Sequence, residues 1–214
     1  MTETIKNYFL LFLHPISSAN SYNSAREGNN SWRYRNGFFN LELSEVILIS
    51  WVFVFISGIY QLILMSSFSE LGRSVYFDAS LPDFAESFIT TGKQMQVFQI
   101  LFQAIFFPIS AWFYTKLWAL VIRFTGKLFG YEEILLYKES REISKNALVS
   151  NVFCLVPIFG EVLRHFYGLL HMFFGLKGNL KMSNMQAIIV LLVPVLFVGA
   201  WLILMFLNLF MIFA

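Results

Sequence analysis

The sequence predicts an all-α membrane protein, a polytopic bundle of five transmembrane helices with a short central hairpin and an N-terminal interfacial helix. Two observations support this prediction. Hydrophobic residues make up 57% of the 214 residues and charged residues only 13%, about half of the roughly 25% charged residues in a typical soluble domain. The apolar residues also occur in long runs, which is typical of membrane spans rather than of a soluble core.

The composition also narrows the classes of partner and cofactor. The formal net charge of +2 is too small to indicate a nucleic-acid-binding protein. Cys154 is the single cysteine, so the chain has no disulfide framework and no thiolate metal cluster. The first apolar run, residues 8–13, is too short for a signal peptide and stops at His14-Pro15. We therefore expect the first span to act as the insertion signal.

Residues 1–43 are expected to form a cytoplasmic N-terminal segment. Residues 2–13 predict a short amphipathic helix whose apolar face carries Ile5, Phe9 and Phe12. It is too short to cross a bilayer, so we expect it to lie in the interface. The polar residues that follow predict a loop that returns to the membrane surface, where Trp32 to Arg35 suit the headgroup layer.

Residues 44–214 are expected to form one transmembrane domain. A polar connection, residues 66–94, holds a Ser80-Leu-Pro-Asp helix start that predicts a small surface helix through Phe88. A charged amphipathic connector follows the second span at residues 125–145. Pro108 and Pro194 lie within spans, where a kink or tilt is expected. The five expected spans are residues 44–65, 95–124, 146–158, 159–176 and 185–213.

Basic residues predict the orientation, because cytoplasmic loops carry an excess of Lys and Arg. Three basic residues fall on one side of the membrane, Arg73, Lys93 and Arg164. Eleven fall on the other side: Lys6, Arg26, Arg33, Arg35, Arg123, Lys127, Lys138, Arg141, Lys145, Lys177 and Lys181. The N-terminus is therefore expected in the cytoplasm and, with five spans, the C-terminus outside.

The central hairpin leaves two structures open. Residues 147–176 are 30 residues, whereas two full crossings need about 40. The pair is either two shortened spans or a re-entrant hairpin that never fully crosses. Both return the chain to the cytoplasm, so the distribution of basic residues does not separate them.

The expected fourth helix carries a polar and small-residue stripe. At helical spacing its members fall within one arc: Glu161, Arg164, His165, Gly168, His171 and Gly175. Ionisable residues within a span are candidates for function, here a proton or anion relay or a polar ligand site. Local charge pairing with a glycine-lined packing face explains the same stripe, and the sequence favours that interpretation. The two histidines lie about 120° apart, which argues against a metal site.

The expected second span carries a matching stripe of polar side chains, Gln96, Gln99, Gln103, Ser110 and Tyr114. Amides in hydrocarbon need partners, so this face should point into the bundle. It lines a polar cavity or makes interhelical hydrogen bonds, and the second interpretation is favoured. A weaker packing stripe on the first span consists of Ser50, Ser57, Gly58 and Gln61. The chain has no nucleophile elbow, zinc-protease motif or phosphate loop, so an enzyme is not predicted and no cofactor is expected.

Several features of the central stretch resemble the Yip family of Ypt/Rab-interacting membrane proteins, in its prokaryotic branch. These are the basic connector before a short segment, the turn Pro157-Ile-Phe-Gly160, the helix ending Gly175-Leu-Lys177, the restart at Ser183–Ala187 and the early Pro194. The opening run before His14-Pro15 is similar as well. The resemblance implies five spans, a cytosolic N-terminus and a bacterial inner membrane. The chain departs from the family pattern at Ser150-Asn151, which lacks the usual preceding tyrosine.

These observations lead to three hypotheses about function. The first is a non-enzymatic membrane protein that acts as a partner-binding, scaffold or accessory subunit. The alternative is a small-solute or ion transporter or channel that uses the polar faces of the second and fourth helices. The third is lipid handling or membrane shaping. The expected partners are membrane lipids and other membrane proteins or further copies of this chain.

Overall fold

The computed structural model describes residues 2–15, 41–76, 83–157 and 159–213. Within these ranges the side chains of residues 2, 65, 68–76, 83–90, 93, 96, 198 and 200–213 are not described. The described residues form helices and no β-strand, so the all-α prediction is confirmed. In chain order they are α1 (Thr2–Leu13), α4 (Leu43–Tyr76), α5 (Asp83–Leu128), α6 (Glu133–Ala147), the 3₁₀-helix η1 (Leu148–Leu155), α7 (Gly160–Asn179) and α8 (Asn184–Phe213).

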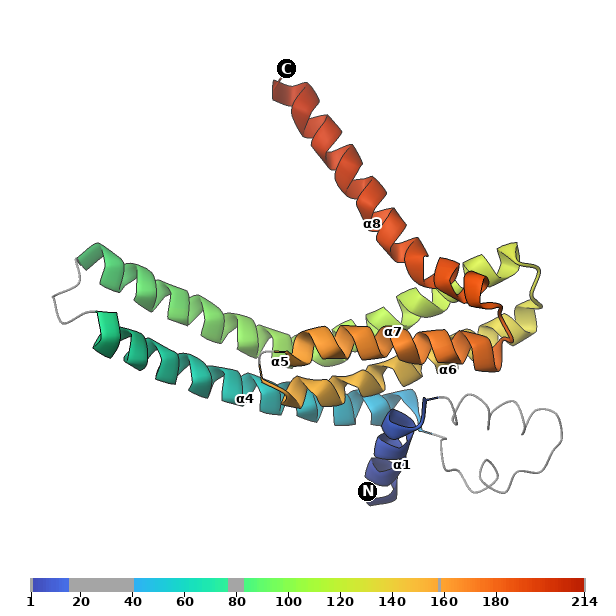
Figure 1. Cartoon of the computed structure of the whole chain (residues 1–214), viewed down its shortest axis with the longest axis horizontal. Coiled ribbons are helices and arrows are strands. Elements are labelled where there is room, and N and C mark those ends of the chain that lie inside the picture. Colours follow the sequence, from blue (N-terminus) through green and yellow to red (C-terminus); the bar gives the residue numbers. More distant parts are fainter. Residues whose placement is uncertain (1, 16–40, 77–82, 158, 214) are drawn as a thin grey trace.

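Helices α4 and α5 form a long antiparallel hairpin, and its outer part projects from the rest of the molecule (Figure 1). We call this outer part, residues 52–76 and 83–103, the arm. The hairpin is closely packed at Gly58, where an added Cβ would lie 2.8 Å from the Ile100 side chain. The Trp51 indole Nε1 donates to the Ala104 carbonyl at 2.6 Å. These two contacts fix the register of α4 against α5.

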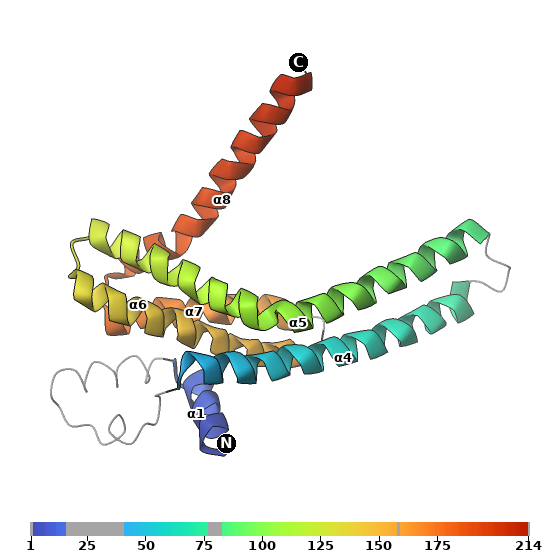
Figure 2. The ribbon, with the colours of Figure 1, turned by 180° about the vertical axis from the view of Figure 1, so that it is seen from behind.

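Both long helices extend beyond the spans that hydropathy predicts. The expected spans 44–65 and 95–124 become helices of 34 and 46 residues. The small surface helix expected from Ser80 through Phe88 has its first residues, 80–82, outside the described residues, and from Asp83 it is the first part of α5. At 1.5 Å per residue α5 measures about 69 Å, more than twice a 30 Å hydrocarbon core. It bends near its middle (Figures 1 and 2). Pro108 lies there in the sequence, and its missing N–H explains the kink.

Two helices of the described chain are long and apolar enough to cross a membrane, Leu43–Leu64 and Val97–Leu128. A shorter apolar stretch, Asn184–Phe197, begins α8. The chain is therefore a candidate membrane protein with two candidate spans by length and composition, and the expected bundle of five spans stays a prediction. The expected 146–158 segment is the eight-residue η1. At about 2.0 Å per residue it is roughly 16 Å long, half of a hydrocarbon core.

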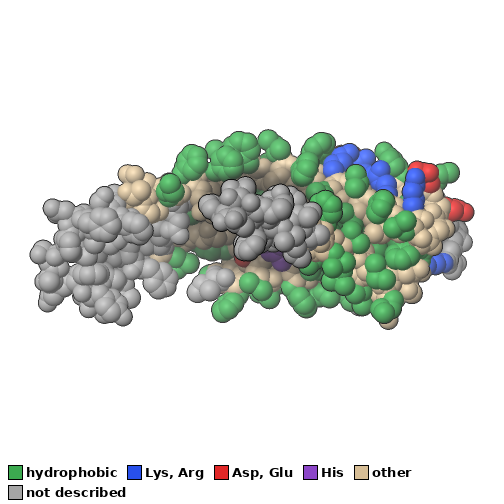
Figure 3. Space-filling view, turned by 90° about the horizontal axis from the view of Figure 1, so that it is seen from above, with side chains coloured by type: hydrophobic (Ala, Val, Ile, Leu, Met, Phe, Trp, Pro, Cys, Tyr) green, Lys and Arg blue, Asp and Glu red, His purple; other side chains and the backbone are tan. Residues whose placement is uncertain are grey.

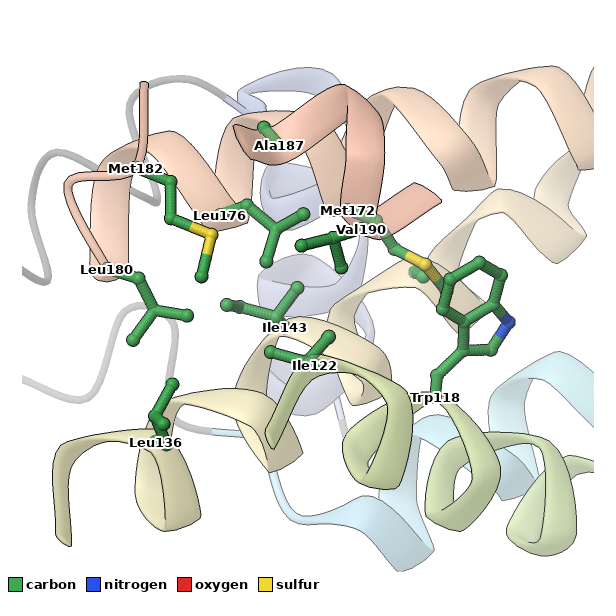
Figure 4. Packing of buried hydrophobic residues seen from close by; sticks show 11 residues of the cluster. Trp118, Ile122, Leu136, Ile143, Met172, Leu176, Leu180, Met182, Ala187 and Val190 are labelled. Carbon is green, nitrogen blue, oxygen red and sulfur yellow. The ribbon is translucent and has the colours of Figure 1, made fainter. Parts of the chain in front are cut away.

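The largest core lies where the second half of α5 meets α6, α7 and the start of α8 (Figure 4). We call this part of the molecule the body. Met172 and Leu176 from α7, Ile122 from α5 and Ile143 from α6 are all at most 1% exposed. An added Cβ at Gly175 would lie 3.0 Å from Ile143, so α7 approaches α6 closely. Burial of this kind stabilises the folded state by roughly 25 cal/mol for each Å² of apolar surface that is removed from water.

Helix α6 is the segment that the sequence presents as a charged cytoplasmic connector. In the structure it packs along α5 and α7, with Glu139 and Lys145 at most 3% exposed. The Asn179 amide donates to Glu139 at 3.1 Å. The Lys145 ammonium donates to the Leu41 carbonyl at 2.6 Å and pairs with Glu142 at 2.5 Å. Glu139 and Lys145 can be buried because each has a hydrogen-bond or ion-pair partner.

A second core joins α1 to α4, to η1 and to the middle of α5, and α1 lies beside the beginning of α4 (Figure 2). The helix bounds agree with the sequence prediction, but the buried face differs by one position. Tyr8 and Leu11 are fully buried, whereas Ile5 and Phe9 are about two-fifths exposed. The helix therefore packs against the bundle through one face and presents Ile5 and Phe9 outward.

Charged side chains gather at one end of the face seen in Figure 3, where α5 passes into α6, and hydrophobic side chains cover much of the other described surface on this face. Lys127 and Glu133 form an exposed ion pair at that end. Helix α8 leaves the body at its start and ends far from the other helices (Figures 1 and 2). Ala187 and Val190 are buried near its beginning, and Phe197 is 74% exposed.

Candidate functional site

A cavity of about 250 Å³ lies between α5, η1 and α7. It is the place where the polar stripes predicted on the second and fourth helices meet. Its polar lining comes from all three elements: Gln103, Ser110 and Tyr114 on α5, Ser150 and Asn151 on η1, and Arg164 and His165 on α7. Its apolar lining comprises Phe107, Ala111, Ala147 and Leu148. We call this space the central cavity.

Arg164 is the cation of the central cavity, and its side chain is 19% exposed. Its guanidinium donates to the Asn151 amide oxygen at 3.3 Å and to a carboxylate oxygen of Glu161. The Asn151 amide nitrogen in turn donates to the Leu148 carbonyl at 2.6 Å. The guanidinium is thus held in one place by an amide and a carboxylate. Glu161 is more exposed, at 58%, and lies outside the cavity lining.

His165 lines the central cavity with a defined ring orientation. Its Nδ1 lies 2.8 Å from the Glu161 backbone carbonyl and 3.7 Å from the Glu161 carboxylate. A carbonyl oxygen can only accept, so Nδ1 carries the hydrogen of a neutral ring and Nε2 holds the lone pair. The side chain is 66% exposed. This arrangement can accept a proton at Nε2.

The α5 stripe is divided by the structure. Gln103, Ser110 and Tyr114 line the central cavity, and the Ser110 hydroxyl donates to the Phe107 carbonyl at 2.9 Å. Gln99 is exposed and lies outside the lining. The side chain of Gln96 lies outside the described set. The cavity therefore uses only the part of the stripe nearest the bend of α5.

His171 belongs to the same helical stripe as His165 but lies in a different environment. It is 4% exposed and packs edge-on against the Tyr167 ring at 5.1 Å. The Tyr167 hydroxyl donates to the Phe12 carbonyl at the end of α1. Within the described residues the His171 Nε2 has no hydrogen-bond partner. His171 is thus part of the contact between α1 and α7, not of the central cavity.

The small residues singled out as packing positions lie at close helix contacts. An added Cβ at Gly168 would lie 3.2 Å from the Ser150 hydroxyl, and Gly58 and Gly175 contact Ile100 and Ile143 as described above. Ser57 is buried and accepts a hydrogen bond from Gln61 at 3.3 Å. Small residues of this kind let helix backbones approach closely in membranes.

Sequence reasoning missed a buried hydrogen-bond chain next to the central cavity. The Ser50 hydroxyl donates to the Leu148 carbonyl at 3.1 Å, and the Tyr8 hydroxyl lies 2.8 Å from the Ser50 hydroxyl and 3.4 Å from the same carbonyl. Burial raises the pKa of the Tyr8 phenol above its ordinary value, so it remains a neutral donor. The sequence signals were a tyrosine at the start of an apolar run and a serine, Ser50, in the packing stripe of the first span. The partners of the tyrosine lie 42 and 140 residues away.

Among the described residues no group of three His, Cys, Asp or Glu side chains could hold a metal ion. Cys154 is buried, and its backbone carbonyl accepts a hydrogen bond from Tyr60 on α4. Comparison of the chain with protein-family models, with curated proteins and with solved structures finds no match.

Proposed function

We propose that this chain is a non-enzymatic integral membrane protein that acts by binding other membrane proteins, as a scaffold or accessory subunit. The observation that carries this proposal is the position of α8. This helix has 30 residues, and among its described side chains those buried against the body, Ala187 and Val190, lie near its beginning. Val195, Leu196 and Phe197 are 64% to 74% exposed. Helices associate in lipid through close packing, so a helix that stands apart offers a face to a partner's helix.

The two apolar helices α4 and α5 support a location in a membrane, and we propose the bacterial inner membrane with a cytoplasmic N-terminus and an external C-terminus. The length of η1 favours a re-entrant hairpin of η1 and α7 over two shortened spans. Three full crossings, by α4, α5 and α8, then place the termini on opposite sides, as five would. The resemblance to the Yip family stays a prediction.

The test of partner binding is photo-crosslinking in intact membranes. A photoreactive residue replaces Phe197 on α8 in one variant, and Ile134 on α6, which is 87% exposed, in the control. We expect the Phe197 variant to form a discrete protein–protein adduct and the Ile134 variant to form none. After gentle extraction, the native mass of the complex should exceed the 24.9 kDa of one chain.

Two results would contradict the proposal. One is crosslinking of position 197 to lipid alone. The other is a strictly monomeric mass under several mild detergents, since an accessory subunit must remain attached to something.

The central cavity favours a second candidate function, passage or binding of a small polar solute or of protons. It carries Arg164, His165 and Gln103 in one space between three helices. The protein reconstituted in liposomes should then conduct protons or small anions, and Gln103→Leu should reduce that flux by about tenfold or more. Gln99→Leu, on the same helix but outside the cavity, is the matched control. Equal flux in both variants and the unmodified protein would exclude this function.

A further inference from the structure

A second, larger hollow lies on the other side of α5, between the start of α4, the bend of α5 and the end of α6. Its volume is about 960 Å³. One wall is apolar and aromatic, formed by Leu41, Leu43, Ile47, Leu48 and Trp51 of the α4 side and by Pro108 and Trp112 of α5. The other wall is α6. We call this hollow the α4–α6 groove.

The α6 wall of the groove is charged. It presents Lys138, Arg141, Glu142 and Lys145, and Glu42 faces them from the chain before α4. Glu142 and Lys145 neutralise each other in an ion pair at 2.5 Å. Among the described residues no acidic side chain pairs with the exposed Arg141 guanidinium. The charged side chains of the groove lining are three cations and two carboxylates, so the lining has a formal charge of +1.

Aromatic rings surround this boundary between apolar and charged walls. The Trp51 indole is held by its hydrogen bond to Ala104. The Lys116 ammonium lies 5.6 Å from the Trp112 ring, and the Arg123 guanidinium lies 4.4 Å from the Tyr137 ring. Tryptophan, tyrosine and basic side chains occur together at the level of lipid headgroups. The groove therefore resembles the membrane interface chemically, because the wall formed by α4 and α5 is apolar and the α6 wall carries the cations.

We infer that the α4–α6 groove binds one anionic phospholipid. Its phosphate group lies against Arg141 and Lys138, and its acyl chains lie along Ile47, Leu48 and Trp112. An arginine fork suits a phosphate because it donates two hydrogen bonds in parallel. A free phosphate ion would use the cations but not the apolar wall, and a zwitterionic lipid would bring its own cation next to Arg141. The inference rests on the chain lying in a membrane, and not on partner binding through α8.

The experiment is native mass spectrometry of the full-length protein in a non-ionic detergent, titrated with phosphatidylglycerol or with phosphatidylcholine. We expect one phosphatidylglycerol molecule to bind at least about tenfold more tightly than phosphatidylcholine. Arg141→Gln should weaken phosphatidylglycerol binding by about tenfold. Lys177→Gln removes the same charge from an exposed site on α7 outside the groove and should leave binding unchanged.

A second variant tests the apolar wall, because Leu48→Gln should weaken binding of the lipid while leaving the cations in place. Leu48 is 61% exposed, so this variant should fold. Equal affinity for the two lipids, or equal effects of Arg141→Gln and Lys177→Gln, would overturn the inference. Complete displacement of the lipid by excess glycerol phosphate would overturn it as well, since the site would then take a free anion. None of these outcomes alters the mass of a complex formed through α8.

Discussion

The body and the arm of this molecule are built from the same helix, α5, yet they bury side chains in different ways. In the body, Ile122 of α5 is fully buried against α6 and α7. In the arm, Phe98, Leu101 and Phe102 of the same helix are 50% to 68% exposed. The Phe98 and Phe102 rings stack, with their centroids 6.1 Å apart. The body carries its own core, whereas the arm relies on its surroundings to cover it.

This difference indicates that the body is stabilised by its own packing, whereas the arm depends on what surrounds it. Large apolar side chains that are exposed on one helix face in this way must be covered by protein or by lipid. The body also holds buried polar pairs, such as Asn179 with Glu139, that require fixed partners. Substitutions should therefore be costly in the body and nearly neutral in the arm while lipid or detergent covers it.

The largest expected effect comes from a matched pair of leucines. Leu176→Ala removes a fully buried side chain from the body and should lower the free energy of unfolding by about 2–5 kcal/mol. Leu101→Ala in the arm, where the side chain is 50% exposed, should change it by less than about 0.5 kcal/mol. Unfolding by sodium dodecyl sulfate in mixed micelles measures both. Similar losses at the two positions would remove the distinction between body and arm.

A matched pair of glycines gives the next largest effect. An added Cβ at Gly160 would lie 2.2 Å from the Phe153 carbonyl oxygen, so Gly160→Ala must shift the turn between η1 and α7. We expect a loss of about 1–3 kcal/mol in the free energy of unfolding. Gly92→Ala in the arm meets nothing within 4 Å and should stabilise α5 by up to about 1 kcal/mol. A neutral Gly160→Ala would show that the turn is not tightly packed.

Removing the buried Tyr8 hydroxyl of α1 should lower the free energy of unfolding by a smaller amount. Tyr8→Phe keeps the ring and removes the hydrogen bond to Ser50, at a cost of about 1 kcal/mol in the free energy of unfolding. Ser50→Ala removes the same bond from the other side. The double variant should therefore cost less than the sum of the two single variants. Strict additivity in this cycle would argue against the Tyr8–Ser50 contact.

The same phenol predicts a weak dependence of stability on pH. Its pKa is raised in the folded protein, so the unfolded chain loses this proton first, near pH 10. The unfolded state then binds fewer protons, and stability falls as pH rises. Between about pH 9 and 10.5 the advantage of the unmodified protein over Tyr8→Phe should shrink by about 0.8 kcal/mol. A constant difference over this range would mean that Tyr8 is accessible to water.

Hydropathy and helical spacing predicted the elements that depend on local sequence. Residues 2–13 form a helix with the expected bounds, and the expected helices 159–176 and 185–213 correspond to α7 and α8. The lengths of α4 and α5 were underestimated, because hydropathy detects only the apolar part of a helix. The burial of α6 was missed for another reason. Glu139 and Lys145 find partners 40 and 104 residues away, which no local pattern reveals.

The central cavity was predictable to the level of a helix face but not of individual residues. Spacing placed Gln99 and Gln103 in one stripe, and only the packing of α5 beside α4 and α6 decides that Gln103 lines the cavity. His165 and His171 likewise shared a stripe. The end of α1 lies beside His171, and the sequence gives no signal that α1 packs there. A stripe therefore identifies a candidate face, whereas the neighbouring helices decide its use.

The most direct test of the difference between arm and body is the environment of two single cysteines in intact membranes. Cys154→Ser, at a buried position, provides the background. Phe102→Cys then reports on the arm and Ile134→Cys, at an 87% exposed position, on α6. We expect position 134 to react readily with a membrane-impermeant maleimide added on its own side. Position 102 should remain unreactive until the membrane is dissolved. Rapid labelling of position 102 in intact membranes would contradict the claim that lipid covers the arm.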